Sequence, residues 1–261
     1  MELTTILGII VGITSVVGAM FFKGLSFGIF NNPAALFVIF VGTAATILIS
    51  YPGEDLKKLG ALFKILFTKQ KDISEIEIIE MMVNLSTSAR KEGLLSLESK
   101  VDEIEDPFIQ KGIRMVVDGV EEEVIADILG LEIQEIEKRH ALNAGIFSSA
   151  GMYAPTLGVL GAVFGLIAAM VHIDDTGEMA HAISAAFMAT VLGIFTGYVL
   201  WHPFAMKLKV KSQHEIGIKE MVVEGLLAIQ RGDSPFMLKD RLMASLPSSK
   251  QEQIAEDMKS E

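Results

Sequence analysis

The long apolar stretches of this sequence contain few side chains that could take part in chemistry. Thr190 is the one polar group deep in the middle of the last stretch, 180–204. Its hydroxyl can face a passing ion or a carboxyl group of another chain, or it can bond to a carbonyl of the preceding helical turn. Thr156 and Thr196 allow the same interpretations, and the sequence leaves them open.

The apolar stretches also lack the groups that carry protons through a membrane. The stretches at 3–22, 33–51, 141–171 and 180–204 contain no Asp, Glu, Lys or Arg in their interiors, and both histidines of the last one stand near its ends. Proton transfer within a membrane needs a side chain that titrates there. If this chain belongs to a proton path, a partner must supply that side chain. The alternative is that the chain transports nothing.

Small residues recur along one face of the last two stretches. They are Ala154, Gly158, Gly161 and Gly165 in one stretch, and Ala182, Ala186, Thr190, Gly193 and Gly197 in the other. Small side chains let membrane helices approach closely. The spacing therefore fits packing between helices of this chain, and it also fits a lining around a helix of another protein.

Two prolines interrupt the same part of the chain. Pro155 lies inside the third apolar stretch and Pro203 lies at the end of the fourth. Proline removes a helical hydrogen bond and bends a helix. We therefore expect bends at both positions, with a functional role or, because membrane helices tolerate proline well, without one.

These residues must be positioned by membrane helices. A membrane-spanning helix needs about 20 mostly apolar residues, and four such stretches in one chain argue against buried helices of a soluble protein. All but Lys23 of the 22 Lys and Arg residues lie between the second and third stretches or after the fourth. The positive-inside rule places those two segments, and both termini, in the cytoplasm.

The sequence therefore predicts an all-α integral membrane protein with four transmembrane helices. Residues 1–51 would hold the first two (about 3–22 and 33–51), and residues 146–205 the last two (about 146–171 and 180–204). Residues 52–145 would form a large helical cytoplasmic loop. The cytoplasmic tail, 206–261, would be disordered after about residue 247 because it is polar there.

Cap and stop signals divide the loop into helices. Ser74 precedes a helix over 75–92 that Gly93 would end. Further helices are expected over 94–104, over 108–117, and from about 121 into the third transmembrane helix without a break. On pattern alone, the charges Arg90 and Glu98 around the Gly93 break indicate a solvated face.

Composition excludes several classes of protein. The formal charge of -11 argues against a nucleic-acid partner. The absence of cysteine excludes disulfides and thiolate metal sites. The sequence contains no metal-ligand cluster, nucleophile–base pair or phosphate loop, so we expect neither an enzyme nor a cofactor or metal. The N-terminus is acidic, which argues against a cleaved signal.

Three segments together resemble the MotA family of flagellar motor stator A subunits, which belongs with the TolQ and ExbB proton channels. They are ARKEGLLSLE at 89–98, APTLGVLGAVFGL at 154–166, and ISAAFMATVLG at 183–193 with WHPFA at 201–205. The resemblance covers about residues 1–245. An ExbB- or TolQ-like energiser of outer-membrane processes is the alternative, although those relatives have three transmembrane helices.

The resemblance implies a stator in a bacterial inner membrane. In the family, five A subunits ring two copies of a B subunit (MotB), which supplies one membrane aspartate. Ions moving past that aspartate drive rotation, and the cytoplasmic loop pushes on the rotor protein FliG. This implication agrees with the missing titratable group in the apolar stretches of this chain.

The resemblance also implies roles for particular residues. The residues expected along the ion path, facing the partner's aspartate, are Thr190, Ala162, Thr156, Gly158 and Gly161. Pro155 and Pro203 would couple ion binding to the loop, and Arg90 and Glu98 would meet the rotor. Sodium-type members carry a threonine where this chain has Ala162. Because sodium needs oxygen ligands and a proton does not, we expect proton drive.

Overall fold

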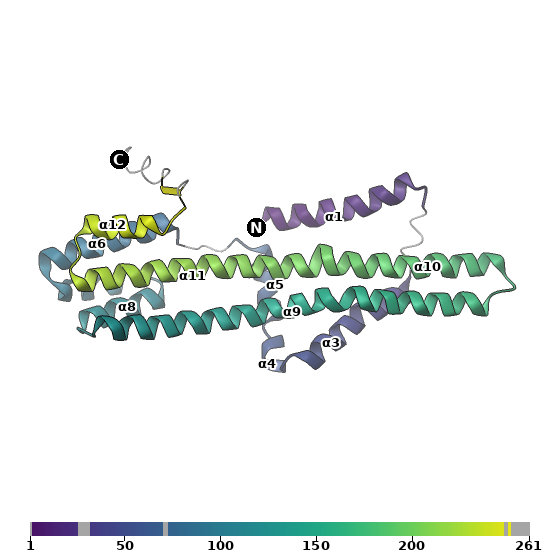
Figure 1. Cartoon of the computed structure of the whole chain (residues 1–261), viewed down its shortest axis with the longest axis horizontal. Helices are drawn as coiled ribbons and strands as arrows, with labels where there is room; N and C mark the ends of the chain where they lie inside the picture. The colour runs from purple at the N-terminus through teal and green to yellow at the C-terminus, as the bar shows by residue number, and fades with distance from the viewer. Residues whose placement is uncertain (1, 26–31, 70–72, 248–249, 252–261) are drawn as a thin grey trace. The chain divides into compact units, whose positions relative to one another are not determined.

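The computed structural model describes residues 2–25, 32–69, 73–247 and 250–251, and these residues form helices without strands (Figure 1). They divide into two compact units. The membrane unit comprises residues 1–70 and 140–210, and the loop–tail unit comprises residues 71–139 and 211–261. These units group residues 52–70 with the apolar helices, whereas the expected loop begins at residue 52, and the expected membrane boundaries remain a prediction. The disorder expected after residue 247 falls mostly on residues outside the described ranges.

Among the described residues, four helices are long and apolar enough to cross a membrane. The first is α1 (Leu3–Phe22), as predicted. The second consists of α2 (Pro33–Leu36), a π-helical segment (Phe37–Val41) and α3 (Gly42–Ser50). The third lies in α9 (Glu122–Val171), and the fourth consists of α10 (Thr176–Phe195), a second π-helical segment (Thr196–Trp201) and the start of α11 (His202–Arg231).

The second transmembrane helix begins with the predicted cap. The Asn32 side chain accepts a hydrogen bond from the Ala35 N–H (3.1 Å), and Pro33 occupies the first turn. A proline is tolerated there because the first N–H groups of a helix have no partner within it. The cap side chain also donates to the Ala185 carbonyl oxygen (3.0 Å), which ties α2 to α10.

The third and fourth transmembrane helices extend far beyond the apolar stretches. The predicted helix from about 121 into the third stretch is confirmed, since α9 is 50 residues long and does not end at Pro155. The fourth helix begins at Thr176, four residues earlier than expected, and Asp175 caps it. It does not end near Pro203. The wider π-helical turn over 196–201 directly precedes this proline, and such turns relieve the clash between a proline ring and the preceding turn.

Two short helices of the membrane unit are absent from the sequence-based prediction. They are α4 (Gly53–Leu56) and α5 (Leu59–Phe67). A cluster of aromatic rings, with centroids 5.2–6.5 Å apart, packs α5 against α9 and α11; it consists of Phe63, Phe67, Phe147, Trp201 and Phe204. Residues 59–67 belong to the expected loop, and this packing groups them with the membrane unit.

The loop–tail unit is a helical domain with its own core. It contains α6 (Glu75–Glu92), a 3₁₀ turn (Leu94–Leu97), α7 (Glu98–Val101), α8 (Pro107–Val117), α12 (Pro235–Ala244) and the outer parts of α9 and α11. Ser74 and Glu77 form a capping box, and Gly93 ends α6 at φ +87°. The helix expected over 94–104 is instead the 3₁₀ turn and α7, which ends at Val101.

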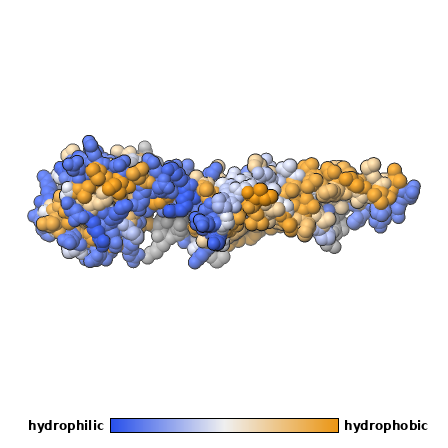
Figure 2. Space-filling view, turned by 90° about the horizontal axis from the view of Figure 1, so that it is seen from below, coloured by the Kyte–Doolittle hydropathy of each residue, from blue (hydrophilic) through white to orange (hydrophobic). Residues whose placement is uncertain are grey.

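The surfaces of the two units differ. Figure 2 shows hydrophobic surface gathered over the membrane unit, whereas the loop–tail unit is mostly hydrophilic. Leu, Ile, Phe and Val side chains of α1 and the apolar part of α9 are largely exposed. This is the surface expected of helices that face lipid.

Candidate functional site

The small residues of α9 and α10 face each other within this chain. A Cβ placed on Gly158 would lie 2.8 Å from the Gly193 Cα and 2.9 Å from the Ala189 carbonyl oxygen. A Cβ placed on Gly193 would lie 2.9 Å from the Ala154 carbonyl oxygen. The two backbones therefore touch here, and no side chain fits between them. Packing within the chain accounts for these glycines.

Gly161 lies at the junction of three helices. A Cβ on this residue would lie 3.3 Å from the Ala189 Cβ of α10 and 3.9 Å from the Ala35 Cα of α2. The bond from Asn32 to the Ala185 carbonyl joins the same two neighbours. The small size of Gly158 and Gly161 thus lets α2, α9 and α10 pack closely. Their expected place along an ion path remains a prediction.

The three threonines singled out from the sequence have different surroundings. Thr196 is buried, and its hydroxyl donates to the Leu192 carbonyl oxygen (2.9 Å). Thr156 is exposed, and its hydroxyl donates to the Met152 carbonyl oxygen (3.2 Å). The Thr190 hydroxyl forms no hydrogen bond with the described residues. Of the three, Thr190 alone has a hydroxyl that neither donates nor accepts a hydrogen bond within the described chain.

Thr190 also lies where an outside group could reach it. It is half-buried on α10, beside the exposed side chains of Phe187, Val191 and Ile194. These three residues recur at helical spacing and form a partly exposed face of α10, and Val191 also lines a small apolar cavity with Ile13, Val16 and Val17 of α1. Ala162 is likewise half-buried, on α9.

The proline of α9 packs beside the π-helical segment. A Cβ on Gly197 would lie 2.7 Å from the Pro155 Cγ and 2.8 Å from the Gly151 carbonyl oxygen. The His202 ring lies over Gly151, within 2.9 Å of a Cβ placed there. Pro203 follows at once and is exposed. The structure therefore brings Pro155 and the turn before Pro203 together at one crossing of α9 with the fourth transmembrane helix.

Arg90 and Glu98 are exposed in the loop–tail unit, on either side of the positive-φ turn at Gly93. Neither forms an ion pair or side-chain hydrogen bond with a described residue. Leu95 stands between them and is 73% exposed. The three side chains thus offer two unpaired charges and an apolar group to a partner.

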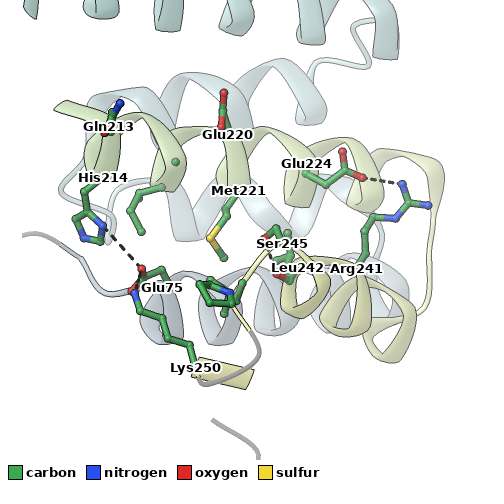
Figure 3. A pocket seen from close by; sticks show the side chains of 14 residues that line it. Glu75, Gln213, His214, Glu220, Met221, Glu224, Arg241, Leu242, Ser245 and Lys250 are labelled. Atoms are coloured by element: carbon green, nitrogen blue, oxygen red, sulfur yellow. Dashed lines mark hydrogen bonds and ion pairs between the residues drawn. The ribbon is translucent and has the colours of Figure 1, made fainter. Parts of the chain in front are cut away.

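A cavity of about 490 Å³ lies between α11, α12 and the start of α6 (Figure 3). Glu75 lies between Lys250 and the His214 ring nitrogen (3.8 Å), and Glu224 accepts from Arg241 (2.7 Å). Burial raises the pKa of Glu75, but hydrogen bonds from Lys250 and the backbone and the nearby Lys250 and His214 groups lower it by more, so the net pKa lies below its ordinary value. The charged groups of this cavity therefore serve mainly to join its walls.

Some buried polar groups are not singled out by the sequence patterns. The Thr43 hydroxyl, the Asn143 side-chain oxygen and the Trp201 indole nitrogen have no hydrogen-bond partner among the described residues. A threonine in an apolar stretch is the only sequence signal for Thr43. Burial distinguishes it from Thr46, whose hydroxyl donates to the Thr43 carbonyl oxygen (2.8 Å).

Known proteins with similar sequences identify the family of this chain. Residues 100–221 match the MotA/TolQ/ExbB proton channel family. The chain is 46% identical to motility protein A of Bacillus subtilis (strain 168), over 98% of this chain and 95% of that protein. This chain belongs to the MotA family. The resemblance based on three segments is therefore confirmed.

Two solved MotA-family complexes share the fold. The structure is similar to the flagellar MotAB stator complex from Bacillus subtilis, with a TM-score of 0.90, 46% identity, and coverage of 96% of this chain and 98% of that one. It is also similar to C. jejuni MotAB, with a TM-score of 0.89, 30% identity, and coverage of 95% and 97%. The all-α fold with four membrane helices is thus the MotA fold.

Proposed function

We propose that this chain is the A subunit of a proton-driven flagellar stator in a bacterial inner membrane. The observation that carries the proposal is a whole-length match to motility protein A in a chain whose membrane helices lack an internal acid or base. Such a chain needs a partner with a titrating group, and the similar solved structures are MotAB complexes. A MotB-type subunit would supply the membrane aspartate, and copies of this chain, five by the family resemblance, would ring it.

Thr190 is our candidate for the group that faces the partner's aspartate. Its hydroxyl, which has no hydrogen bond within the described chain, and its place beside the exposed side chains of Phe187 and Ile194 support this role. Ala162 and Thr156 would lie along the same ion path, with Gly158 and Gly161 holding the helices that form it. Ala162 offers no oxygen ligand, which supports proton rather than sodium drive.

The ion gradient is large enough for a mechanical step. A unit charge that crosses the membrane gains about 2.3 kcal/mol per 100 mV. This energy can bias an element that has two states a few kcal/mol apart. We propose that Pro155 and Pro203 lie in such an element, because the first packs beside the π-helical turn that precedes the second.

The loop–tail unit would face the cytoplasm and push on FliG. The distribution of Lys and Arg supports this orientation, with both termini on the same side. Arg90 and Glu98 are the proposed rotor contacts, because both are exposed and neither has a partner in this chain.

The ion-path proposal can be tested by co-expressing the chain with its B subunit and measuring proton conductance and swimming. Thr190→Ala should reduce conductance about tenfold, the effect expected for one lost hydrogen bond to a charged group. Thr14→Ala is the matched control, since the Thr14 hydroxyl is exposed and donates to its own helix (2.7 Å). Equal conductance in both variants would exclude this role for Thr190. Swimming that needs sodium and resists an uncoupler would exclude proton drive.

The rotor proposal has its own test. Arg90→Glu should abolish most swimming without changing assembly, whereas the exposed Lys138→Glu should have little effect because its ion pair is a surface pair. A compensating charge reversal on the rotor should restore swimming to the first variant. Normal swimming after reversal of both Arg90 and Glu98, with an unaltered rotor, would contradict the proposal.

A further inference from the structure

The short helix α5 has an apolar face and a charged face. Leu62 and Leu66 are buried, and the aromatic cluster packs this helix against α9 and α11. Lys64 is exposed on the opposite side, because a residue two positions from each leucine lies about half a turn away on a helix. A helix with Leu and Phe on one face and Lys on the other is typical of segments that lie at a membrane surface.

The two ends of α5 are tied to the ends of two transmembrane helices. The segment α4–α5 follows directly after α3, which ends the second transmembrane helix. At the other end of α5, the Phe67 carbonyl oxygen accepts from the Glu2 N–H (3.0 Å), and the Leu66 carbonyl oxygen accepts from the Thr5 hydroxyl of α1 (3.2 Å). Figure 1 shows α5 running across α9 and α11 rather than along them. In a membrane, α5 therefore lies along the surface and does not cross it.

The aromatic cluster sets the depth of α5 in the membrane. Phe147 stands near the start of the third apolar stretch, and Trp201 and Phe204 stand near the end of the fourth. By the proposed topology, both positions are at the cytoplasmic boundary of the hydrocarbon, where aromatic side chains are enriched in membrane proteins. Since α5 packs on these rings, it lies at the depth of the lipid headgroups of the inner leaflet.

Three lysines on and beside α5 have no partner within the described chain. Lys57, Lys64 and Lys69 are exposed, and none of them forms an ion pair or a side-chain hydrogen bond with a described residue. We call these three side chains the basic face. Lys58 differs, because it is paired with Asp55 (3.3 Å). The segment 53–69 contains four lysines and two acidic residues, so it keeps an excess of positive charge.

The positive charge of this segment is local. The loop–tail unit contains 15 Lys and Arg residues but 27 Asp and Glu residues, so an anionic membrane surface repels it. Anionic lipids give the cytoplasmic leaflet a negative potential that falls off within a Debye length, about 10 Å at 0.1 M salt. Lysines at the depth of the headgroups gain most from this potential, and the basic face lies at that depth.

We propose that the basic face binds the phosphate groups of anionic phospholipids in the inner leaflet. The proposal rests on the cytoplasmic orientation given under the proposed function. Each lysine ammonium meets the phosphate of its own lipid, while Leu62 and Leu66 hold the helix on the protein. A zwitterionic lipid carries a cation beside its phosphate and attracts a lysine less. If these lysines only set the topology during insertion, the finished complex needs no anionic lipid.

The test uses the intact stator complex in nanodiscs that contain phosphatidylglycerol and phosphatidylcholine in equal amounts. After extraction into a mild detergent, native mass spectrometry counts the lipids retained per complex and reports whether the ring is intact. Retained phosphatidylglycerol should exceed phosphatidylcholine about fivefold, the preference expected for one lysine at an anionic surface. High salt during extraction should reduce this preference. Equal retention of the two lipids at low salt would overturn the proposal.

Matched variants locate the site. Replacing all three lysines of the basic face by Gln should abolish the preference, whereas replacing them by Arg, which keeps the charge, should preserve it. The control removes the same charge from three exposed or half-buried lysines of the loop–tail unit and should also preserve the preference. Its substitutions are Lys91→Gln, Lys138→Gln and Lys239→Gln. Loss of the preference in the control as well would assign it to net charge and refute the basic face as the site.

Imaging of the complex in nanodiscs gives a second readout. Headgroup density beside α5 that is lost in the Gln variant and kept in the control would support the proposal. Protein density from a neighbouring subunit against the basic face would refute it. A complex that conducts protons and supports swimming, but retains the two lipids equally, would refute this proposal and leave the proposed function intact.

Discussion

Backbone contact through glycine distinguishes the two units of this chain. In the membrane unit, Gly158 and Gly193 bring two backbones into contact. In the loop–tail unit, Gly112 makes room for a side chain, because a Cβ there would lie 2.3 Å from the Leu226 Cδ1. Glycine thus allows backbone contact between helices in the membrane unit, where Gly151 also accepts a side chain, and it accepts a large apolar side chain in the loop–tail unit.

The solvent around each unit explains the difference. In water, burial of large apolar side chains is the main driving force, and Met82, Ile113 and Leu226 are completely buried in the loop–tail unit. In lipid, moving a leucine from the bilayer to a helix interface gains little, so membrane helices associate through close contact of small residues. Two long helices belong to both units: α9, and the continuous helix formed by α10, the π-helical segment and α11. Along each of them, packing through small residues in the membrane unit changes to packing of large apolar side chains in the loop–tail unit.

The largest expected effect comes from breaking the backbone contact. Gly193→Leu places a side chain where the Gly158 Cα is 2.7 Å from a Cβ, and neither backbone can move without separating α9 from α10. We expect no assembled stator, measured as the yield of intact complex in detergent. Gly18→Leu, which meets no atom within 4 Å, should assemble normally. Assembly of both variants would show that the glycine contact is dispensable.

The second-largest effect is expected from a substitution in the hydrophobic core of the loop–tail unit. Ile113→Ala should cost about 2–5 kcal/mol through lost burial and the resulting cavity, whereas Leu95→Ala, at an exposed position, should cost less than about 0.5 kcal/mol. Hydrogen exchange of the purified complex should show faster exchange in α8 for the first variant only. Equal protection in both would mean that this core does not stabilise α8.

A smaller effect distinguishes the two uses of glycine directly. Gly112→Ala crowds the flexible end of the Leu226 side chain, which costs about 1–3 kcal/mol, but it gains about 1 kcal/mol of helix propensity. We expect a net loss of about 1 kcal/mol and an assembled complex. Gly193→Ala should be more damaging, because its methyl group meets backbone. The thermal stability of the two purified complexes compares them, and the reverse order would contradict the distinction.

The smallest effect concerns the ion cluster around Glu75. The pKa of the Glu75 carboxyl group is lower in the folded chain than its ordinary value of 4.5. The ion cluster therefore stabilises the fold at pH values above 4.5, and this stabilisation is lost as the pH falls through the lowered pKa. Glu75→Gln should therefore be less stable than the unmodified chain near pH 7, and the difference should shrink in acid. Thermal unfolding over a pH series measures it. A difference that does not depend on pH would assign the effect to packing.

Local signals in the sequence determined much of this fold. The apolar stretches located all four membrane helices, and the missing breaker predicted the long α9. The caps at Asn32 and Ser74 and the stop at Gly93 also formed as predicted. These features depend on residues a few positions apart, since helix hydrogen bonds and caps join near neighbours. The roles of Thr190, Arg90 and Glu98 remain predictions.

Other features were decided by contacts between residues distant in the chain. The sequence could not place α5 with the membrane helices, because that position depends on aromatic contacts with α9 and α11. Nor could it distinguish the free hydroxyl of Thr190 from the bonded one of Thr196, since both lie in similar apolar surroundings in the sequence. Small-residue spacing fits a neighbouring helix of the same chain or of another. Only the tertiary structure showed that Gly158 meets Gly193, because the spacing of small residues marks one face of a helix but does not say which helix packs against it.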